Sequence, residues 1–260
     1  MVAGKELMAM IFDDRSERRE TLEVSRYRLR PLTCEEVRAL DDYAVAELNM
    51  PTMVLMENAG RGAARVLSWA MFETGLISSE SQPATVVVIC GQGNNGGDGA
   101  VLARHLEASG VAKVRVVWTT PPGELKGDAL AQYRILQAAG IEQSRVFEPM
   151  ELESILKPAD WVVDGLFGTG LTRPLIPGDL AGDIVGIINE SGKPVMALDI
   201  PSGMDANTGE VLGVAIKARL TATFVAPKVG FYERYASEWT GRVEIVDIGL
   251  PRHALRRFEE

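Results

Sequence analysis

Residues 86–106 read VVVICGQGNNGGDGAVLARHL, and their hydrophobic period changes within a few positions. The stretch opens with consecutive apolar β-formers, a run typical of a strand that is buried on both faces. Beyond a glycine-rich turn, apolar residues recur at helical spacing from Ala100 to Leu106. Glycine lets a ligand approach the backbone closely, and the first turn of a helix presents unpaired N–H groups. The stretch therefore predicts a strand over 85–90, a ligand-binding turn and a helix over 98–109.

The glycines of this turn match the pattern G-x-G-x-x-G of dinucleotide-binding folds, beginning at Gly91. Those folds also place an acidic residue about 20 positions further on, at the end of the next strand, and residues 116–120 (VVWTT) contain none. Asp98 at the expected helix start would repel a pyrophosphate, and no Lys-Ser or Lys-Thr pair follows to make a P-loop. Two interpretations stay open. Asn94 and Asn95 shape a plain turn that Asp98 caps, or the turn holds a polar ligand.

Strand and helix patterns alternate along most of the chain, which is typical of an α/β fold with a doubly wound, parallel sheet. A capping box at Thr33 and Glu36 starts a helix that ends before Pro51. The other expected helices cover 53–69, 124–139, 149–156 and 179–191, and the other expected strands cover 114–118, 145–147, 161–164, 195–199, 220–225 and 243–248.

The composition is that of an ordinary globular domain. The chain has 260 residues, of which 46% are hydrophobic and 24% charged, so one α/β domain is expected over 32–250. Residues 1–31 mix charges of both signs with few apolar anchors, and we expect an N-terminal extension there and a C-terminal tail over 251–260. No apolar run approaches transmembrane length and no signal peptide is recognisable, which predicts a soluble, cytoplasmic protein.

Charge and residue usage disfavour several classes of function. The net charge of −9 argues against nucleic acid or an anionic membrane as a partner, so a small molecule is expected. Cys34 and Cys90, the two cysteines, do not suffice for a disulfide framework or a cysteine metal site and suit a reducing compartment. With His105 and His253 as the two histidines, zinc and Ser-His-Asp chemistry both lack their parts.

Polar residues follow three of the expected strands. Asn94, Asn95 and Asp98 follow one of them, Asp164 ends another and begins DGLFGTGLTRP, and Asp199 ends a third and begins DIPSGMD. Taken singly, the two strand-end aspartates are more often turn or cap residues than catalysts. Parallel strands bring their carboxyl ends to one edge of a sheet, however, so these groups are expected to face one crevice.

The same crevice offers candidate ligands for a cation and for an anion. Asn95, Asp164 and Ser202 carry oxygen donors, which suit a hard cation, and a monovalent ion fits because no histidine or thiolate is at hand. The loop that follows Asp164 contains Arg173, whose guanidinium can meet a phosphate. Lys228 can bring an ammonium group close to the crevice, although a solvated lysine is the ordinary expectation.

Five ordered motifs resemble those of one protein family. They are MENAGR (56–61), GQGNNGGDG (91–99), DGLFGTG (164–170), DIPSGMD (199–205) and APK (226–228), and the similarity runs from about Leu32 to Gly249. Together they look like the motifs of the YjeF N-terminal domain, the NAD(P)H-hydrate epimerases. The resemblance implies a three-layer, Rossmann-like α/β/α sandwich with a mostly parallel central sheet.

The resemblance also implies an activity. Members of this family are isomerases that interconvert the R and S epimers of NADH or NADPH hydrated at C6 of the nicotinamide ring, and a separate dehydratase then repairs the S form. The dehydratase domain often fused to this one needs many more residues than the chain has, so we expect the epimerase alone. The resemblance further implies a homodimer, for which the MENAGR region can supply the contact.

Carried over position by position, the resemblance implies two sets of site residues. Asn95, Asp164 and Ser202 would hold a potassium ion. Arg173 stands where some relatives have lysine. The residues implied to contact the substrate are Asn94, Asn95, Gly96, Gly97, Asp98, Gly168, Thr169, Gly170, Leu171, Thr172, Arg173, Pro174 and Asp199.

The chemistry of such a substrate calls for a carboxylate. The C6 hydroxyl beside the ring nitrogen makes a carbinolamine, so it can leave as water to give an iminium, and water can return to the other face without C–H cleavage. One group must act as acid and then as base, and Asp199 is the first candidate and Asp98 the second. Two alternatives stay open: a nucleotide-binding interaction module without turnover, and an NAD-dependent dehydrogenase, which the missing ribose acid disfavours.

Overall fold

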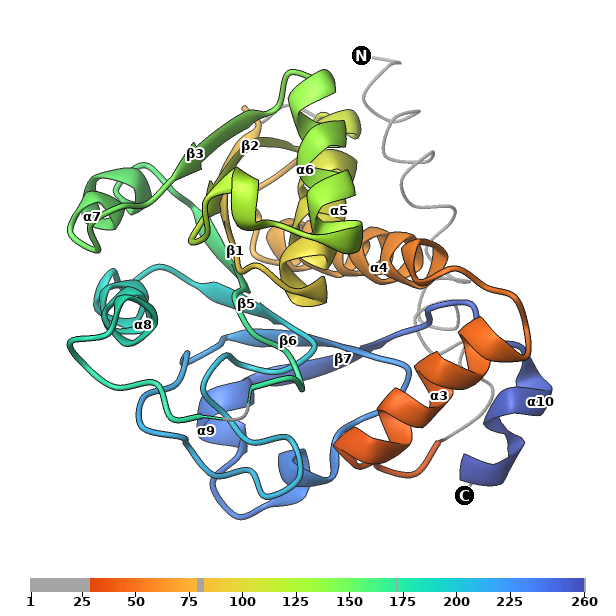
Figure 1. Ribbon diagram of the computed structural model, residues 1–260. Coiled ribbons are helices and arrows are strands. Elements are labelled where there is room, and N and C mark those ends of the chain that lie inside the picture. The colour runs from red at the N-terminus through yellow and green to blue at the C-terminus, as the bar shows by residue number, and fades with distance from the viewer. Residues whose placement is uncertain (1–28, 79–81, 172, 260) are drawn as a thin grey trace.

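The computed structural model describes residues 29–78, 82–171 and 173–259 (Figure 1). Within these residues a seven-stranded, fully parallel sheet has the order β3-β2-β1-β4-β5-β6-β7, which confirms the α/β class. The expectations for residues 1–28 and for Thr172 lie outside the described residues. The strands are β1 Ala84–Cys90, β2 Ala112–Trp118, β3 Glu142–Arg145, β4 Trp161–Gly165, β5 Val195–Leu198, β6 Leu220–Phe224 and β7 Arg242–Val246.

Helices cover both faces of the sheet, so the domain has the expected three layers (Figure 1). α4 (Thr52–Glu73), α5 (Asn94–Ala108) and α6 (Gly127–Ala138) lie on one face. α7 (Glu151–Leu156) and α8 (Leu180–Glu190) lie on the other. Within the described ranges, every helix is too short or too polar to cross a bilayer. The remaining helices are α3 Cys34–Ala46, α9 Ser237–Thr240 and α10 Arg252–Leu255, with 3₁₀ turns at Pro122–Glu124, Val229–Tyr232 and Arg256–Phe258.

The position of β1 in the middle of the sheet explains its uninterrupted apolar run. Val86, Val88 and Cys90 belong to the core beneath α4 and α5, whereas Val87 and Ile89 belong to the core beneath α7 and α8. A strand with helices on both faces has no polar side, so it lacks the alternation of a half-exposed strand. Each such side chain contributes about 1.5–3 kcal/mol through burial, which makes β1 a main stabilising element of the fold.

α5 and β3 both begin earlier in the chain than predicted, and both differences come from tertiary packing. α5 begins at Asn94 rather than at residue 98, so most of the glycines belong to the helix and not to the turn before it. A Cβ on Gly96 would lie 2.0 Å from the carbonyl oxygen of Gly91, so glycine is what lets the first helical turn pack on the end of β1. β3 covers Glu142–Arg145 rather than 145–147, because pairing with β2 selects polar residues that hydrophobicity does not mark.

The two ends of the described chain lie together. Leu29 forms an antiparallel bridge with Glu259, and the amide of Arg30 donates to the carbonyl of Phe258 at 3.0 Å. The ring of Phe258 is buried, with the guanidinium of Arg30 5.2 Å from its centroid. The segment after residue 250 therefore packs on the domain, and the proposed boundaries at 31 and 251 stay predictions. The predicted capping box at Thr33 is confirmed at the start of α3.

Candidate active site

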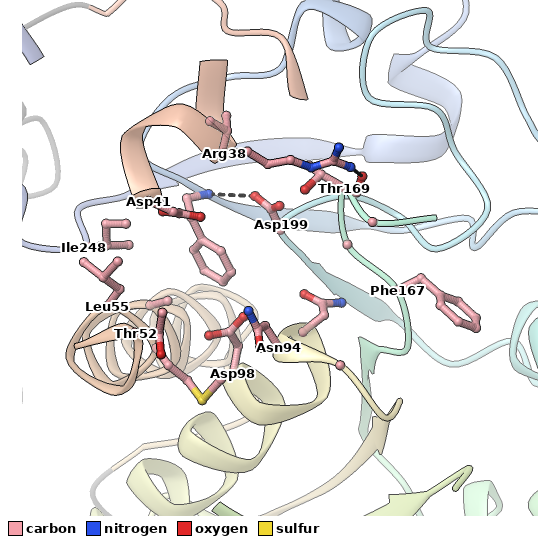
Figure 2. Close-up of a pocket in the computed structure, with 18 of the residues that line it drawn as sticks. Arg38, Asp41, Thr52, Leu55, Asn94, Asp98, Phe167, Thr169, Asp199 and Ile248 are labelled. Atoms are coloured by element: carbon pink, nitrogen blue, oxygen red, sulfur yellow. Dashed lines mark hydrogen bonds between the residues drawn. The ribbon is translucent and has the colours of Figure 1, made fainter. Parts of the chain in front are cut away.

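A cavity of about 650 Å³ opens at the carboxyl edge of the sheet (Figure 2). β1 and β4 are neighbours there, although the chain first runs outward from β1 to β2 and β3. Open α/β sheets bind ligands at such a point, where the strand order reverses. The lining residues come from α3, α4, the start of α5 and the segments that follow β4, β5, β6 and β7.

The start of α5 places two asparagines at the cavity. Asn94 and Asn95 both line it, and the buried carboxamide of Asn95 has no hydrogen-bond partner among the described residues. Buried polar groups are nearly always hydrogen-bonded, so this unpartnered carboxamide indicates a ligand-binding position. Gly96 and Gly97 do not line the cavity; the first packs on the end of β1, and a Cβ on the second would lie 2.4 Å from Cε of Met56.

Asp98 lies in the second turn of α5, so the interpretation of Asp98 as a helix cap is wrong. The N-cap is Gly93, which makes no side-chain hydrogen bond. The side chain of Asp98 is buried in the cavity wall (Figure 2). Burial raises the pKa of Asp98 well above its usual value, and the charges of Asp199 and Asp41 raise it further. These surroundings favour the protonated, neutral acid.

Asp199 follows β5 and has a cationic partner. Its Oδ1 accepts from Nζ of Lys228 at 2.6 Å and from the amide of Phe224 at 3.2 Å. Lys228 is fully buried, and its Nζ also donates to Oγ1 of Thr223 at 2.9 Å and to the Phe224 carbonyl at 3.0 Å, so the expectation of a solvated lysine is wrong. The backbone of Asp199 is left-handed, with φ +63°, a strained conformation for a non-glycine residue that is common at functional sites. The buried ammonium group therefore pairs directly with the side chain of Asp199.

Asp41 on α3 is a third carboxyl group of the cavity, and the sequence analysis missed it. Burial and then the charge of Asp199 raise the pKa of Asp41 to about 6, while Lys228 acts in the opposite direction. Two consecutive acidic residues, Asp41 and Asp42, are typical of the solvent face of a helix. The spacing from Val37 could have placed Asp41 on the inward face of this helix, because residues four apart share a helix face and Val37 is buried.

The loop after β4 forms another wall of the cavity. Arg38 on α3 donates from Nη2 to the carbonyl of Thr169 at 2.8 Å, which joins α3 to this loop (Figure 2). The side chain of Arg173 is 72% exposed, and its partner Asp179 is 4.0 Å away, so its guanidinium is open to a ligand. Among the predicted contacts, Pro174 does not line the cavity and Thr172 lies outside the described residues. Those that line it are Gly168, Thr169, Gly170, Leu171 and Arg173.

Asp164 and Ser202 meet behind the cavity. Ser202 donates to the Asp164 carboxylate from Oγ at 2.6 Å and from its amide at 2.8 Å, and the amide of Leu166 donates to it at 3.1 Å. Burial raises the pKa of Asp164 to about 6, although the hydrogen bonds from Ser202 and Leu166 lower it. The backbone carbonyl of Asn95 lies 3.1 Å from the Cβ position of Gly165, so α5 begins against the end of β4.

These three residues satisfy the chemistry of a hard-cation site. The carboxylate of Asp164, the hydroxyl of Ser202 and the unpartnered amide of Asn95 together offer oxygen donors without nitrogen or sulfur. A Cβ on Gly168 would lie 3.5 Å from Oδ1 of Asn95 and 3.6 Å from Oδ2 of Asp199, so the loop, Asn95 and Asp199 lie together. The residues present therefore fit a cation beside the cavity.

A family model described as the YjeF-related protein N-terminus matches residues 52–230. This chain belongs to that family. The NAD(P)H-hydrate epimerase of Rhodopirellula baltica is 42% identical over 230 residues, which make up 88% of this chain and 88% of that protein. The NAD(P)H-hydrate epimerase of Pirellula staleyi is 36% identical and matches 85% of this chain and 93% of its own. The family match includes the cavity segments that follow β1, β4, β5 and β6.

A longer relative and a solved structure extend the comparison. The bifunctional NAD(P)H-hydrate repair enzyme Nnr of Salinibacter ruber is 41% identical over 240 residues, which make up 88% of this chain but 42% of that enzyme. The crystal structure of the yeast protein YNL200c superposes with a TM-score of 0.70 at 21% identity, over 88% of this chain and 93% of the yeast chain. That likeness confirms the α/β fold.

Proposed function

We propose that this protein is an NAD(P)H-hydrate epimerase, which interconverts the R and S epimers of NADH or NADPH hydrated at C6 of the nicotinamide ring. The observation that carries the proposal is a pair of aspartates in one cavity. Asp98 is buried and favoured as the neutral acid, whereas Asp199 is paired with Lys228. A relative that is 42% identical over 88% of each chain bears the name of this activity.

The reaction breaks and remakes one C–O bond. The lone pair of the ring nitrogen forms a double bond to C6 as the hydroxyl takes up a proton and departs as water. The resulting iminium is planar at C6, so water can add to either face. Addition to the opposite face returns the electron pair to the nitrogen and releases one proton, which gives the other epimer with no C–H bond broken.

Asp98 and Asp199 divide the two proton transfers in this proposal, whereas the sequence had pointed to one group for both. Asp98, as the neutral acid, donates a proton to the departing hydroxyl. Asp199, whose Oδ1 is paired with the ammonium group of Lys228, accepts a proton from the entering water and stabilises the cationic iminium while it exists. The two side chains come from different walls of the cavity, which suits departure and addition on opposite faces (Figure 2).

The remaining cavity residues bind the nucleotide in this proposal. Asn94 and the unpartnered amide of Asn95 offer hydrogen bonds to the polar edge of the hydrated ring. The exposed guanidinium of Arg173 suits the phosphates. The proposal includes both NADH hydrate and NADPH hydrate as substrates.

We include a potassium ion held by Asn95, Asp164 and Ser202. The buried Asn95 amide without a partner supports it, and so do the carboxylate of Asp164 and the hydroxyl of Ser202, which meet behind the cavity. When bound, such an ion neutralises the Asp164 carboxylate and fixes the ends of β4 and β5 against α5. A cation close to the iminium would repel it, so we assign the ion a structural role.

The proposal extends to partners and compartment. A dehydratase would consume the S epimer. Buried cysteines without disulfides suit a reducing cytoplasm, and we retain a homodimer. The MENAGR segment makes contacts within the chain, because Glu57 binds Arg104 and His105, and the side chain of Asn58 donates to the Ile248 carbonyl. A dimer contact is therefore better sought on other surfaces.

The decisive experiment follows the conversion of purified R-hydrate by chromatography, with and without the protein, in water enriched in ¹⁸O. We expect the protein to accelerate approach to the epimer equilibrium and to introduce solvent oxygen at C6 with each inversion. Binding without acceleration would support the interaction module instead. Hydride transfer to a second substrate would support the dehydrogenase.

A further inference from the structure

The proposed reaction leaves the enzyme in a protonation state that differs from the starting one. During one inversion Asp98 loses a proton to the departing hydroxyl and Asp199 gains a proton from the entering water. A second inversion in the same direction therefore requires a proton to return to Asp98. The two carboxyl groups lie on different walls of the cavity, so this return needs a carrier (Figure 2).

Asp41 occupies the place that such a carrier needs. It lines the same cavity from α3 and is partly exposed, so its carboxyl group reaches both the cavity and solvent. Within the described part of the chain, no hydrogen bond or ion pair is found that fixes this carboxyl group. Asp41 also interacts with both partners, because the charge of Asp199 raises the pKa of Asp41 and the charge of Asp41 raises that of Asp98.

We propose that Asp41 returns the proton from Asp199 to Asp98 between turnovers, through cavity water. The inference rests on the proposed epimerase function. The Asp41 carboxylate takes a proton from Asp199, and protonated Asp41 gives one to the Asp98 carboxylate, so one proton moves between the outer pair and only O–H bonds change. A pKa of about 6 lets Asp41 accept and release a proton near neutrality.

The charged groups around Asp41 are compatible with this role. Arg38 and Asp42 flank it on α3, and Asp98 faces it from α5. Asp199 and Lys228 face it from the ends of β5 and β6, where the buried ammonium group is already bound to Asp199. The carboxyl group of Asp41 is therefore free to exchange its proton, whereas Asp199 has its Oδ1 occupied.

The test separates one inversion from repeated inversions. Asp41→Asn is studied with enzyme in excess over R-hydrate, where each molecule turns over once, and again at steady state with substrate in excess. We expect the single-turnover rate to stay near that of the wild type. The steady-state kcat should fall on the order of 10²-fold, the low end of the range for a lost proton-transfer group.

Two further variants and a small acid sharpen the test. Imidazole, added at constant pH and ionic strength, should restore the steady-state rate of Asp41→Asn and leave the wild type unchanged, which a structural defect would not reproduce. Asp41→Glu should keep most of the activity. Glu47→Gln, which removes an exposed carboxylate at the end of the same helix, is the matched control and should behave as the wild type.

Each other outcome overturns the inference. Equal losses in single and repeated turnovers without rescue by imidazole would place Asp41 in binding or in the bond-breaking step. Unchanged rates in both would remove its role.

If Asp41→Asn does not fold, the wild type is tested with an equilibrated, isotope-labelled epimer mixture. Excess unlabelled R-hydrate converts the enzyme to the protonation state that accepts the S epimer, so labelled S should transiently convert to labelled R. If the label distribution does not shift at a saturating R-hydrate concentration, there is no separate proton-return step. A wild type that cannot invert R-hydrate in one turnover removes the epimerase function itself, and the proton return with it.

Discussion

One wall of the cavity is formed by α5 (the α5 wall), and another by the segments that follow β5 and β6 (the β5–β6 wall). Each contains an aspartate, and the two aspartates have opposite surroundings. On α5, Asp98 is buried with other carboxylates as its charged neighbours, and its pKa is raised well above the usual value. On the β5–β6 wall, Asp199 has a buried ammonium group 2.6 Å from its Oδ1. The difference teaches that, in the proposed reaction, the position of one cation, Lys228, distinguishes the aspartate assigned as acid from the one assigned as base.

The largest effect should come from removing either carboxyl group. Asp98→Asn and Asp199→Asn should each lower kcat by about 10²- to 10⁴-fold, because each removes a proton-transfer group. The measurement is the rate of R-hydrate inversion, corrected for the uncatalysed rate. Glu107→Gln, at an exposed position of α5, is the control and should retain full activity. Wild-type rates in both aspartate variants would show that neither wall carries the chemistry.

The ion pair on the β5–β6 wall should dominate stability. Lys228→Met leaves the buried Asp199 carboxylate without its cation, so the free energy of unfolding should fall by about 3–5 kcal/mol. Lys228→Met combined with Asp199→Asn should recover much of that loss, since no unpaired charge remains. Urea unfolding measures both, with Lys217→Met as an exposed lysine control. An additive double variant would mean that the pair is not energetically coupled.

On the α5 wall, Asp98 should make the stability of the protein fall as the pH rises. The pKa of Asp98 is higher in the folded state, so the folded protein binds more protons and Asp98 lowers stability as pH rises above its unfolded value of about 4. Asp98→Asn removes this term. Its melting temperature should match the wild type at pH 4 and exceed it at pH 8. Parallel pH profiles of the two proteins would show that Asp98 is ionised in the folded state.

The smallest effect concerns the ion proposed behind both walls. Potassium chloride should raise the melting temperature relative to choline chloride at equal ionic strength. The free energy of unfolding should rise by about 1–3 kcal/mol when the potassium concentration is well above the Kd. Asn95→Ala should remove the difference, because the amide oxygen is lost. Asn94→Ala, at the adjacent position, is the control. Equal melting temperatures of the wild type in the two salts would exclude a potassium-specific site.

The sequence predicts those parts of the fold and the cavity that short stretches of residues mark on their own. β1 is marked by an apolar run. Asp164 lies near the end of β4 and Asp199 follows β5, and parallel pairing brings these two strand ends together. Asp41 and the burial of Lys228 escaped prediction, because both depend on how α3 and the end of β6 close over the cavity. Hydropathy alone assigns both residues to solvent.

The start of α5 escaped for a related reason. Glycine disfavours helix, so propensity moves the predicted start to Asp98. Close packing of Gly96 on Gly91 overrides that preference. A single sequence does not contain this contact, since it depends on how the helix returns over its own strand.

That close contact also bears on the timing of binding. Because Gly96 rests on the backbone of Gly91, the helix start and strand end form one rigid corner, and a nucleotide bound there has little backbone left to order. Entry and exit should then depend on α3 and the loop after β4, which are joined by the exposed hydrogen bond from Arg38 to Thr169. We therefore expect slow hydrogen exchange at the corner and fast exchange in the loop, with the residence time of the nucleotide set by the weaker side.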